Sequence, residues 1–120
     1  MARLMSSTEL HQRMETEEDF LLIDVNDPDQ FQEEHIPGAI NIPLTELPSR
    51  ARKDLSKNQR IVVYGANHEA ERSTQAADLL EEVGFRKVSD FDGGLDAWKR
   101  AGYQTAGKKP EVVGEIAPPS

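Results

Sequence analysis

The stretch IVVYGANHEAERSTQAADLLEEVGF, residues 61–85, decides the fold of this chain. It begins with an apolar run typical of a buried strand, continues through a short polar loop and enters a helix. The helical part places Ala76, Leu80 and Val83 on one side. Gly84 follows as the left-handed residue that ends the helix. A loop between a strand and a helix lies at the carboxyl end of the strand, where α/β proteins bind ligands. The stretch therefore predicts both a fold and a site.

Strands and helices alternate along the rest of the chain. Ser6 and Glu9 form a capping box that begins a helix. Pro48 interrupts its segment, so only short turns of helix are expected there. Strands are expected at 20–25, 39–42, 60–64 and 87–91, and helices at 6–14, 27–34, 44–55, 73–83 and 95–101. This alternation predicts an α/β fold with a parallel sheet covered by helices on both faces.

One domain is expected over residues 1–104, followed by a flexible tail over residues 105–120. Within the domain, we expect Trp98 to pack the last helix onto the sheet. We expect Gly93 and Gly94 to supply the backbone angles of a turn.

Charge and composition exclude several classes of function. The net charge of −8 disfavours nucleic acid as a partner, and no apolar run approaches the roughly 20 residues that span a bilayer. The amino-terminal residues do not resemble a signal peptide, so the expected location is the cytoplasm. The chain has no cysteine, which excludes disulfides, thiolate metal sites and a thiolate nucleophile supplied by this chain.

Three motifs resemble the rhodanese-like domain family. LLIDVNDPDQFQEEHIPGAINIPL (21–44) is similar to its L-I-D-V-R, G-H-I-P-G-A and I-N-I-P pattern. The stretch 61–85 resembles its active-site strand, loop and helix, and VSDFDGGLDAWKRAGY (88–103) resembles its G-G-x-x-x-W motif. The resemblance implies a three-layer fold with a central five-stranded parallel sheet. It also implies a family whose active members are sulfurtransferases that carry sulfur as a persulfide on a loop cysteine.

The resemblance leaves two positions open for the family's nucleophile. Gly65 follows the strand directly, and Ala70 matches a second cysteine in a related subgroup with the pattern Y-C-A-N-x-x-C-x-x-S. Neither residue carries a thiol. Asn26 also replaces the usual arginine, whereas Asp24 matches an aspartate that braces the active-site region in the family.

The loop itself retains candidates for weak anion binding. The backbone amides at the start of the helix, together with Arg72, are suited to bind an anion, although Glu69 and Glu71 oppose it. Ser73 is expected to cap the helix and His68 to be a solvated loop residue; a hydrolase using both would need a further orienting group. The candidates for loop or anion binding are Ala66, Asn67, His68, Glu69, Glu71, Arg72 and Ser73.

Three hypotheses for the function follow. The first is a rhodanese-like domain without sulfurtransferase activity, acting as a binding or regulatory module for a protein partner. The second is a thiosulfate-type sulfurtransferase whose cysteine has been replaced in this chain. The third is weak binding of small anions, or other chemistry, at the loop. No cofactor, metal, nucleic acid or membrane is expected as a partner, and the acidic surface favours basic partners.

Overall fold

The fold is built on one parallel sheet. The computed structural model describes residues 2–16 and 19–108. Its strands run in the order β1-β5-β4-β2-β3, and every neighbouring pair is parallel. They are β1 (Arg3–Leu4), β2 (Leu21–Asp24), β3 (Ile40–Asn41), β4 (Ile61–Tyr64) and β5 (Val88–Phe91). β4 therefore lies in the middle of the sheet, so the loop after it lies at the centre of the side where the parallel strands end.

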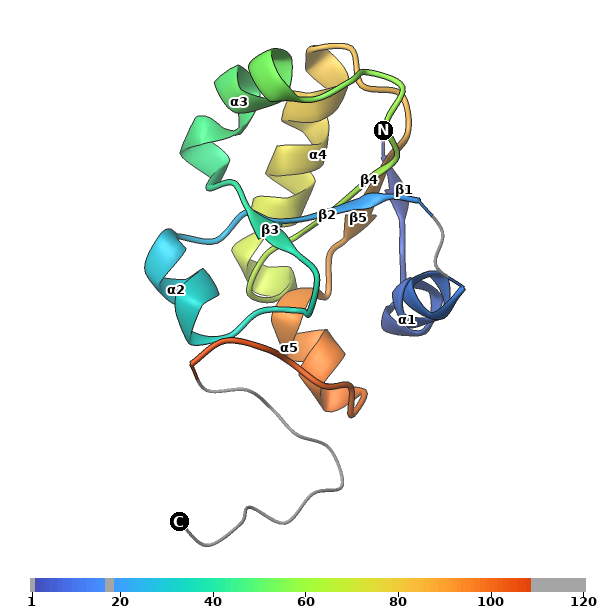
Figure 1. The fold of residues 1–120 in the computed structure, drawn as a ribbon, viewed down its shortest axis with the longest axis vertical. Helices are drawn as coiled ribbons and strands as arrows, with labels where there is room; N and C mark the ends of the chain where they lie inside the picture. The colour runs from blue at the N-terminus through green and yellow to red at the C-terminus, as the bar shows by residue number, and fades with distance from the viewer. Residues whose placement is uncertain (1, 17–18, 109–120) are drawn as a thin grey trace, which may run out of the picture.

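Helices cover both faces of this sheet. Figure 1 shows α3 and α4 on one side, and α1 and α5 on the other. Their bounds are α1 (Ser7–Glu15), α2 (Pro28–Glu33), α3 (Leu47–Asp54), α4 (Arg72–Glu82) and α5 (Gly94–Arg100), with 3₁₀ turns η1 (Leu44–Glu46) and η2 (His68–Ala70). The predicted α/β architecture with a five-stranded parallel sheet is confirmed.

Each face of the sheet has its own apolar layer. Ile23 and Val63 pack with the buried residues of α3 and α4, whereas Leu22 and Val62 pack with Leu10 of α1 and with α5. Because successive strand residues point to opposite faces, both layers draw on the same short strands. This explains why β4 reads as a continuous apolar run rather than an alternating one.

Trp98 joins α5 to the second layer. Its ring is 2% exposed, and its indole N–H donates to the Gln104 carbonyl oxygen at 2.9 Å. The expectation that Trp98 packs the last helix onto the sheet is confirmed.

The first two helices begin as their sequences predict. The Ser6 hydroxyl accepts a hydrogen bond from the Glu9 N–H at 3.1 Å, which caps α1. In α2, Asp27 is the capping residue, and its N–H donates to the Gln30 side chain at 3.2 Å. The segment around Pro48 is more regular than expected, because the proline falls in the first turn of α3, where its missing N–H interrupts nothing.

Two features differ from the sequence-based expectations. The short edge strand β1 was not predicted; it pairs Arg3 with Ser89 of β5. Residues 105–108 pack on the domain instead of leaving it at Gln104. Thr105 is 2% exposed, and Ala106 forms an antiparallel bridge with His35. The packed chain thus extends beyond the predicted boundary, and the rest of the predicted tail, residues 109–120, lies outside the described residues.

No helix in the described part of the chain is long and apolar enough to cross a membrane.

Candidate functional site

The loop after β4 is fixed to the start of α5 by main-chain hydrogen bonds. The Leu95 N–H donates to the Gly65 carbonyl oxygen at 3.0 Å, and the Asp96 N–H donates to the Ala66 carbonyl oxygen at 2.9 Å. These donors belong to the first turn of α5, where helix N–H groups have no partner inside the helix. Main-chain hydrogen bonds therefore hold residues 65 and 66 against the first turn of α5.

Gly94 allows this close approach. Its φ is +66°, and an added Cβ would lie 2.5 Å from the Gly65 carbonyl oxygen. Gly93 has a φ of −66°, which any residue adopts, but its Cβ would lie 2.6 Å from the Ala97 Cβ. The expectation that both glycines supply turn angles is confirmed for Gly94 and wrong for Gly93, where lack of space excludes a side chain.

Gly65 faces the amino end of α4. A Cβ placed on it would lie 3.3 Å from the Arg72 Cβ, 3.7 Å from the Ser73 nitrogen and 3.8 Å from the Asn26 Oδ1. A side chain at this position would therefore meet the start of a helix, which favours negative charge. Ala70 instead ends the exposed turn η2. The two candidate nucleophile positions thus lie in different surroundings.

Asp24 and Asn26 form a buried polar layer beside Gly65. Asp24 is 0% and Asn26 is 3% exposed, and the Asn26 N–H donates to Asp24 Oδ1 at 2.8 Å. Asn41, which sequence reasoning missed, donates from Nδ2 to the carbonyl oxygens of Asp24 and Asn26 at 3.0 and 2.9 Å. Asn41 belongs to the I-N-I-P motif, but only the pairing of β3 with β2 shows that it reaches the segment after β2. The layer holds the segment after β2 against the loop.

Burial dominates the electrostatics of this layer. Desolvation raises the pKa of the Asp24 carboxyl, although hydrogen bonding to Asn26 and the nearby Tyr64 oppose the shift. Burial, with Asp24 adding to it, also raises the pKa of Tyr64, whose hydroxyl accepts a hydrogen bond from the Ile36 N–H at 3.0 Å. Within the described residues, Asp24 Oδ2 and Asn26 Oδ1 accept no hydrogen bond of acceptable geometry.

Acidic side chains dominate the rim of the loop. Arg72, the expected anion ligand, is paired with Asp27 at 3.2 Å. His68 Nδ1 lies 3.0 Å from Asp92 Oδ2, so its side chain is exposed as expected but has a carboxylate partner. Glu69 and Glu71 are exposed on the same loop. We call these four carboxylates the acidic rim: Asp27, Glu69, Glu71 and Asp92.

The start of α4 differs from the prediction. The helix begins at Arg72, and its capping residue is Glu71, which has a left-handed φ of +56°. Ser73 is the second helical residue and is 3% exposed, so the expectation that it caps the helix is wrong. The cap at the preceding turn η2 is Asn67, whose Oδ1 accepts from the Ala70 N–H at 2.9 Å.

The geometry gives no support to a serine hydrolase or a metal centre. His68 contacts Asp92, and no hydrogen bond joins it to Ser73 in the described chain. Thr74 donates its hydroxyl to Asp90 Oδ2 at 2.8 Å. Across residues 2–16 and 19–108, no group of three or more His, Asp and Glu side chains is arranged to hold a metal ion.

Comparison with known proteins agrees with this architecture. The sequence model of the family described as Rhodanese-like domain matches residues 6–101. A sulfurtransferase of Allochromatium vinosum is 32% identical over 102 residues, which cover 85% of this chain and 92% of that protein. The chain therefore belongs to the rhodanese-like domain family.

Two further relatives define how far the likeness extends. The solution structure of the rhodanese-like domain of Alr3790 from Anabaena sp. superimposes with a TM-score of 0.82 at 35% identity, covering 100% of this chain and 93% of that one. The putative sulfur carrier protein YrkF of Bacillus subtilis is 33% identical over 87 residues, 72% of this chain. The match spans only 45% of the length of YrkF.

Proposed function

We propose that this chain is a rhodanese-like domain without sulfurtransferase activity that serves as a binding or regulatory module. The observation that carries the proposal is the residue at position 65. It follows the central strand and faces the start of α4, yet it is a glycine in a chain that has no cysteine. Neither a hydroxyl nor an imidazole in the loop replaces the soft, polarizable nucleophile that a persulfide requires.

We further propose that Gly65, and not Ala70, corresponds to the nucleophile of the active relatives. A side chain on Gly65 points to the Ser73 amide, where a helix start stabilises a thiolate. Gly65 is also absent from the residues with positive φ, so an L-residue fits its backbone. Ala70 also has an ordinary backbone, but it is exposed in the turn η2.

The partner of this module presents a basic segment. The acidic rim carries four carboxylates, of which Arg72 neutralises one and His68 contacts another. Glu69 and Glu71 remain exposed beside them. The same charges disfavour thiosulfate and phosphate at the loop, since an incoming anion would have to displace Asp27 from Arg72.

The decisive experiment measures sulfur transfer from thiosulfate to cyanide by the parent protein and by Gly65→Cys. The parent should produce no thiocyanate above the uncatalysed background. Gly65→Cys should gain turnover that the acidic rim keeps slow, and intact-mass analysis at high thiosulfate concentration should show one added sulfur atom. Turnover by the parent protein would overturn the proposal.

Ala70→Cys is the matched control, because it adds one thiol to the same loop. It should alkylate readily, since it is exposed, but transfer no sulfur. Activity in Ala70→Cys with silence in Gly65→Cys would reverse the assignment of the nucleophile position. Activity restored at Gly65 would also support the hypothesis that this chain is a sulfurtransferase whose cysteine has been replaced.

A further inference from the structure

A cavity rich in arginine and lysine lies at the amino-terminal ends of strands β4 and β5, opposite the loop. Its volume is about 370 Å³, and five of its ten lining residues are cationic. The whole chain has only 14 Lys and Arg in 120 residues and a net charge of −8. We call this cavity the basic groove, after its cations Arg3, Arg13, Arg60, Arg86 and Lys87.

The parallel sheet gathers three of these cations. Arg60 directly precedes β4, and Arg86 and Lys87 directly precede β5. The Ile61 N–H donates to the Lys87 carbonyl oxygen at 2.9 Å, so the two strands begin side by side. The length of β4 separates its first residue, Ile61, from Gly65 by about 13 Å, at roughly 3.3 Å per residue. The basic groove is therefore distinct from the loop site.

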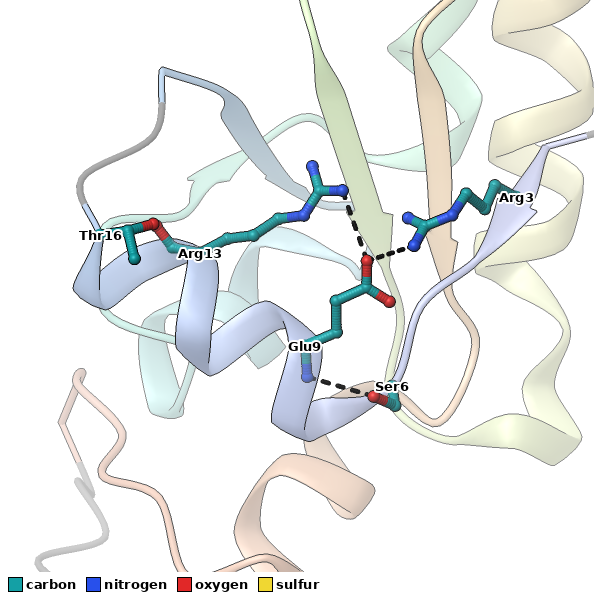
Figure 2. Close-up of polar contacts among 5 residues, drawn as sticks. All are labelled: Arg3, Ser6, Glu9, Arg13 and Thr16. Atoms are coloured by element: carbon teal, nitrogen blue, oxygen red, sulfur yellow. Dashed lines mark hydrogen bonds and ion pairs between the residues drawn. The ribbon is translucent and has the colours of Figure 1, made fainter.

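The opposite wall is held in place by an ion-pair network. Figure 2 shows the guanidinium groups of Arg3 from β1 and Arg13 from α1 reaching the carboxylate of Glu9 from two sides. The Arg13 contact is 3.3 Å. The hydrogen bond from Arg3 is the main cause that lowers the pKa of Glu9, so this carboxylate stays ionised. One carboxylate thus orients two guanidinium groups.

The two cations that directly precede β5 are not neutralised in the same way. Arg86 and Lys87 are exposed, and neither forms an ion pair with a described residue. Ser89 adds a hydroxyl to the lining, and Phe20 adds an aromatic wall. The groove therefore has positive charge on two sides, a hydrogen-bonding group and an apolar surface, in a volume typical of small-molecule sites.

We propose that the basic groove binds a small di- or triphosphate group, either free or carried by a nucleotide. A ligand with several charged oxygens matches a groove that has cations on two walls, because it offers an acceptor to each wall. Guanidinium groups pair with phosphate oxygens in bidentate geometry, which suits the oriented Arg3 on one wall. The proposal does not depend on the function of the loop.

The test is a titration of the whole chain with inorganic pyrophosphate at low ionic strength, followed by calorimetry and amide NMR shifts. Binding should weaken as salt is added, and the shifts should concentrate at residues 60–62 and 86–89. Arg86→Gln combined with Lys87→Gln should lower the affinity about tenfold or more, since each lost charge-assisted contact is worth roughly that factor. The absence of binding, or shifts confined to residues 65–72, would overturn the proposal.

Arg52→Gln combined with Lys53→Gln is the matched control. It removes the same two charges from the end of α3, outside the groove. The affinity of this control for pyrophosphate should stay within twofold of that of the parent protein. If both double variants lose the same affinity, the effect comes from net charge alone and the proposed site is refuted. Titration with ADP identifies the source of the phosphate. If ADP binds more tightly than pyrophosphate and Phe20→Leu abolishes that gain in affinity, the ligand is a nucleotide. Equal affinity for ADP and pyrophosphate indicates that the groove recognises the phosphate group alone.

Discussion

The missing side chain of Gly94 lets two main-chain segments touch at the candidate site. Its left-handed φ and the 2.5 Å approach to the Gly65 carbonyl oxygen are separate constraints on the same residue. The first is a local strain for any L-residue, and the second is a steric conflict between segments that are far apart in sequence.

Gly94→Ala should therefore lower the free energy of unfolding by about 2–4 kcal/mol, combining left-handed strain with overpacking. It should also move the amide NMR signals of residues 65–67. Gly102→Ala separates the two causes, because Gly102 has a φ of +89° but open space around its Cβ position. This control should lose only about 1–2 kcal/mol and leave the loop signals unchanged. Equal losses in the two variants would show that the contact with the loop contributes nothing.

Asp24 makes the stability of the fold depend on pH. Its pKa is raised in the folded state from a usual value of 3.8, because the carboxyl is buried. Between that value and the raised pKa, the folded protein binds more protons than the unfolded chain. The contribution of Asp24 to stability is thus present at low pH and is lost as the pH rises through this window.

Asp24→Asn should remove this loss and keep an oxygen for the Asn26 N–H. We expect the unfolding free energy of the variant, relative to that of the parent, to increase from pH 4 to pH 7. Urea denaturation at a series of pH values measures the difference. If the unfolding free energies of the two proteins change in parallel over this pH range, burial of the ionised Asp24 carboxylate does not destabilise the fold.

Among the secondary-structure elements, long apolar patterns were predictable and short pairings were not. The strand β4 and the helix α4 have burial patterns that residues 61–85 display locally. The two residues of β1 are exposed, and the strand exists only because β5 offers an unpaired edge. The same holds for the site: Asp24 and Gly65 follow from motifs, but the contact between Gly94 and Gly65 depends on how two loops meet.

One carboxylate, that of Glu34, adds side-chain contacts from the end of α2 to α5 and the segment after it. Glu34 accepts a hydrogen bond from the Thr105 hydroxyl at 2.8 Å and another from Lys99 Nζ at 2.9 Å. Because Glu34 is only 16% exposed, these two donors stabilise its charge in a partly dry environment.

Thr105→Val keeps the shape of the side chain but removes the hydroxyl donor. It should lower the unfolding free energy by about 1–2 kcal/mol, since the lost hydrogen bond is to a charged group. Thr45→Val, at an exposed threonine in η1, should change it by less than about 0.5 kcal/mol in urea denaturation. A loss confined to Thr45→Val would refute the role of the segment.

Opposite charges gather at the two ends of the parallel strands. All strands run in one direction, the basic groove lies where they begin, and the acidic rim lies where β2, β4 and β5 end. The net charge of −8 gives no sign of this separation, and from it we concluded only that nucleic acid is disfavoured and that basic partners are favoured. Spatial grouping of charges follows from strand order, and a single sequence gives no direct measure of it.

A tetralysine peptide should accordingly bind at the acidic rim and shift the amide signals of residues 65–72 at low salt. Glu69→Gln combined with Glu71→Gln should weaken this binding severalfold, and saturating pyrophosphate should not prevent it. Asp78→Asn with Glu82→Gln, exposed on the outer face of α4, is the matched control and should retain the binding. Shifts spread evenly over the surface would contradict a localised acidic site.

The two hydrogen bonds from α5 to the carbonyl oxygens of Gly65 and Ala66 use groups that every amino acid carries at those positions. A Cβ on residue 65 would lie 3.3 Å from the Arg72 Cβ, so a substitution there requires a small shift of α4 but removes neither hydrogen bond. The glycine codons GGT and GGC differ from the cysteine codons TGT and TGC by a single base. Where one of these two codons encodes Gly65, a single base change would place a thiol at the start of α4 without removing either hydrogen bond.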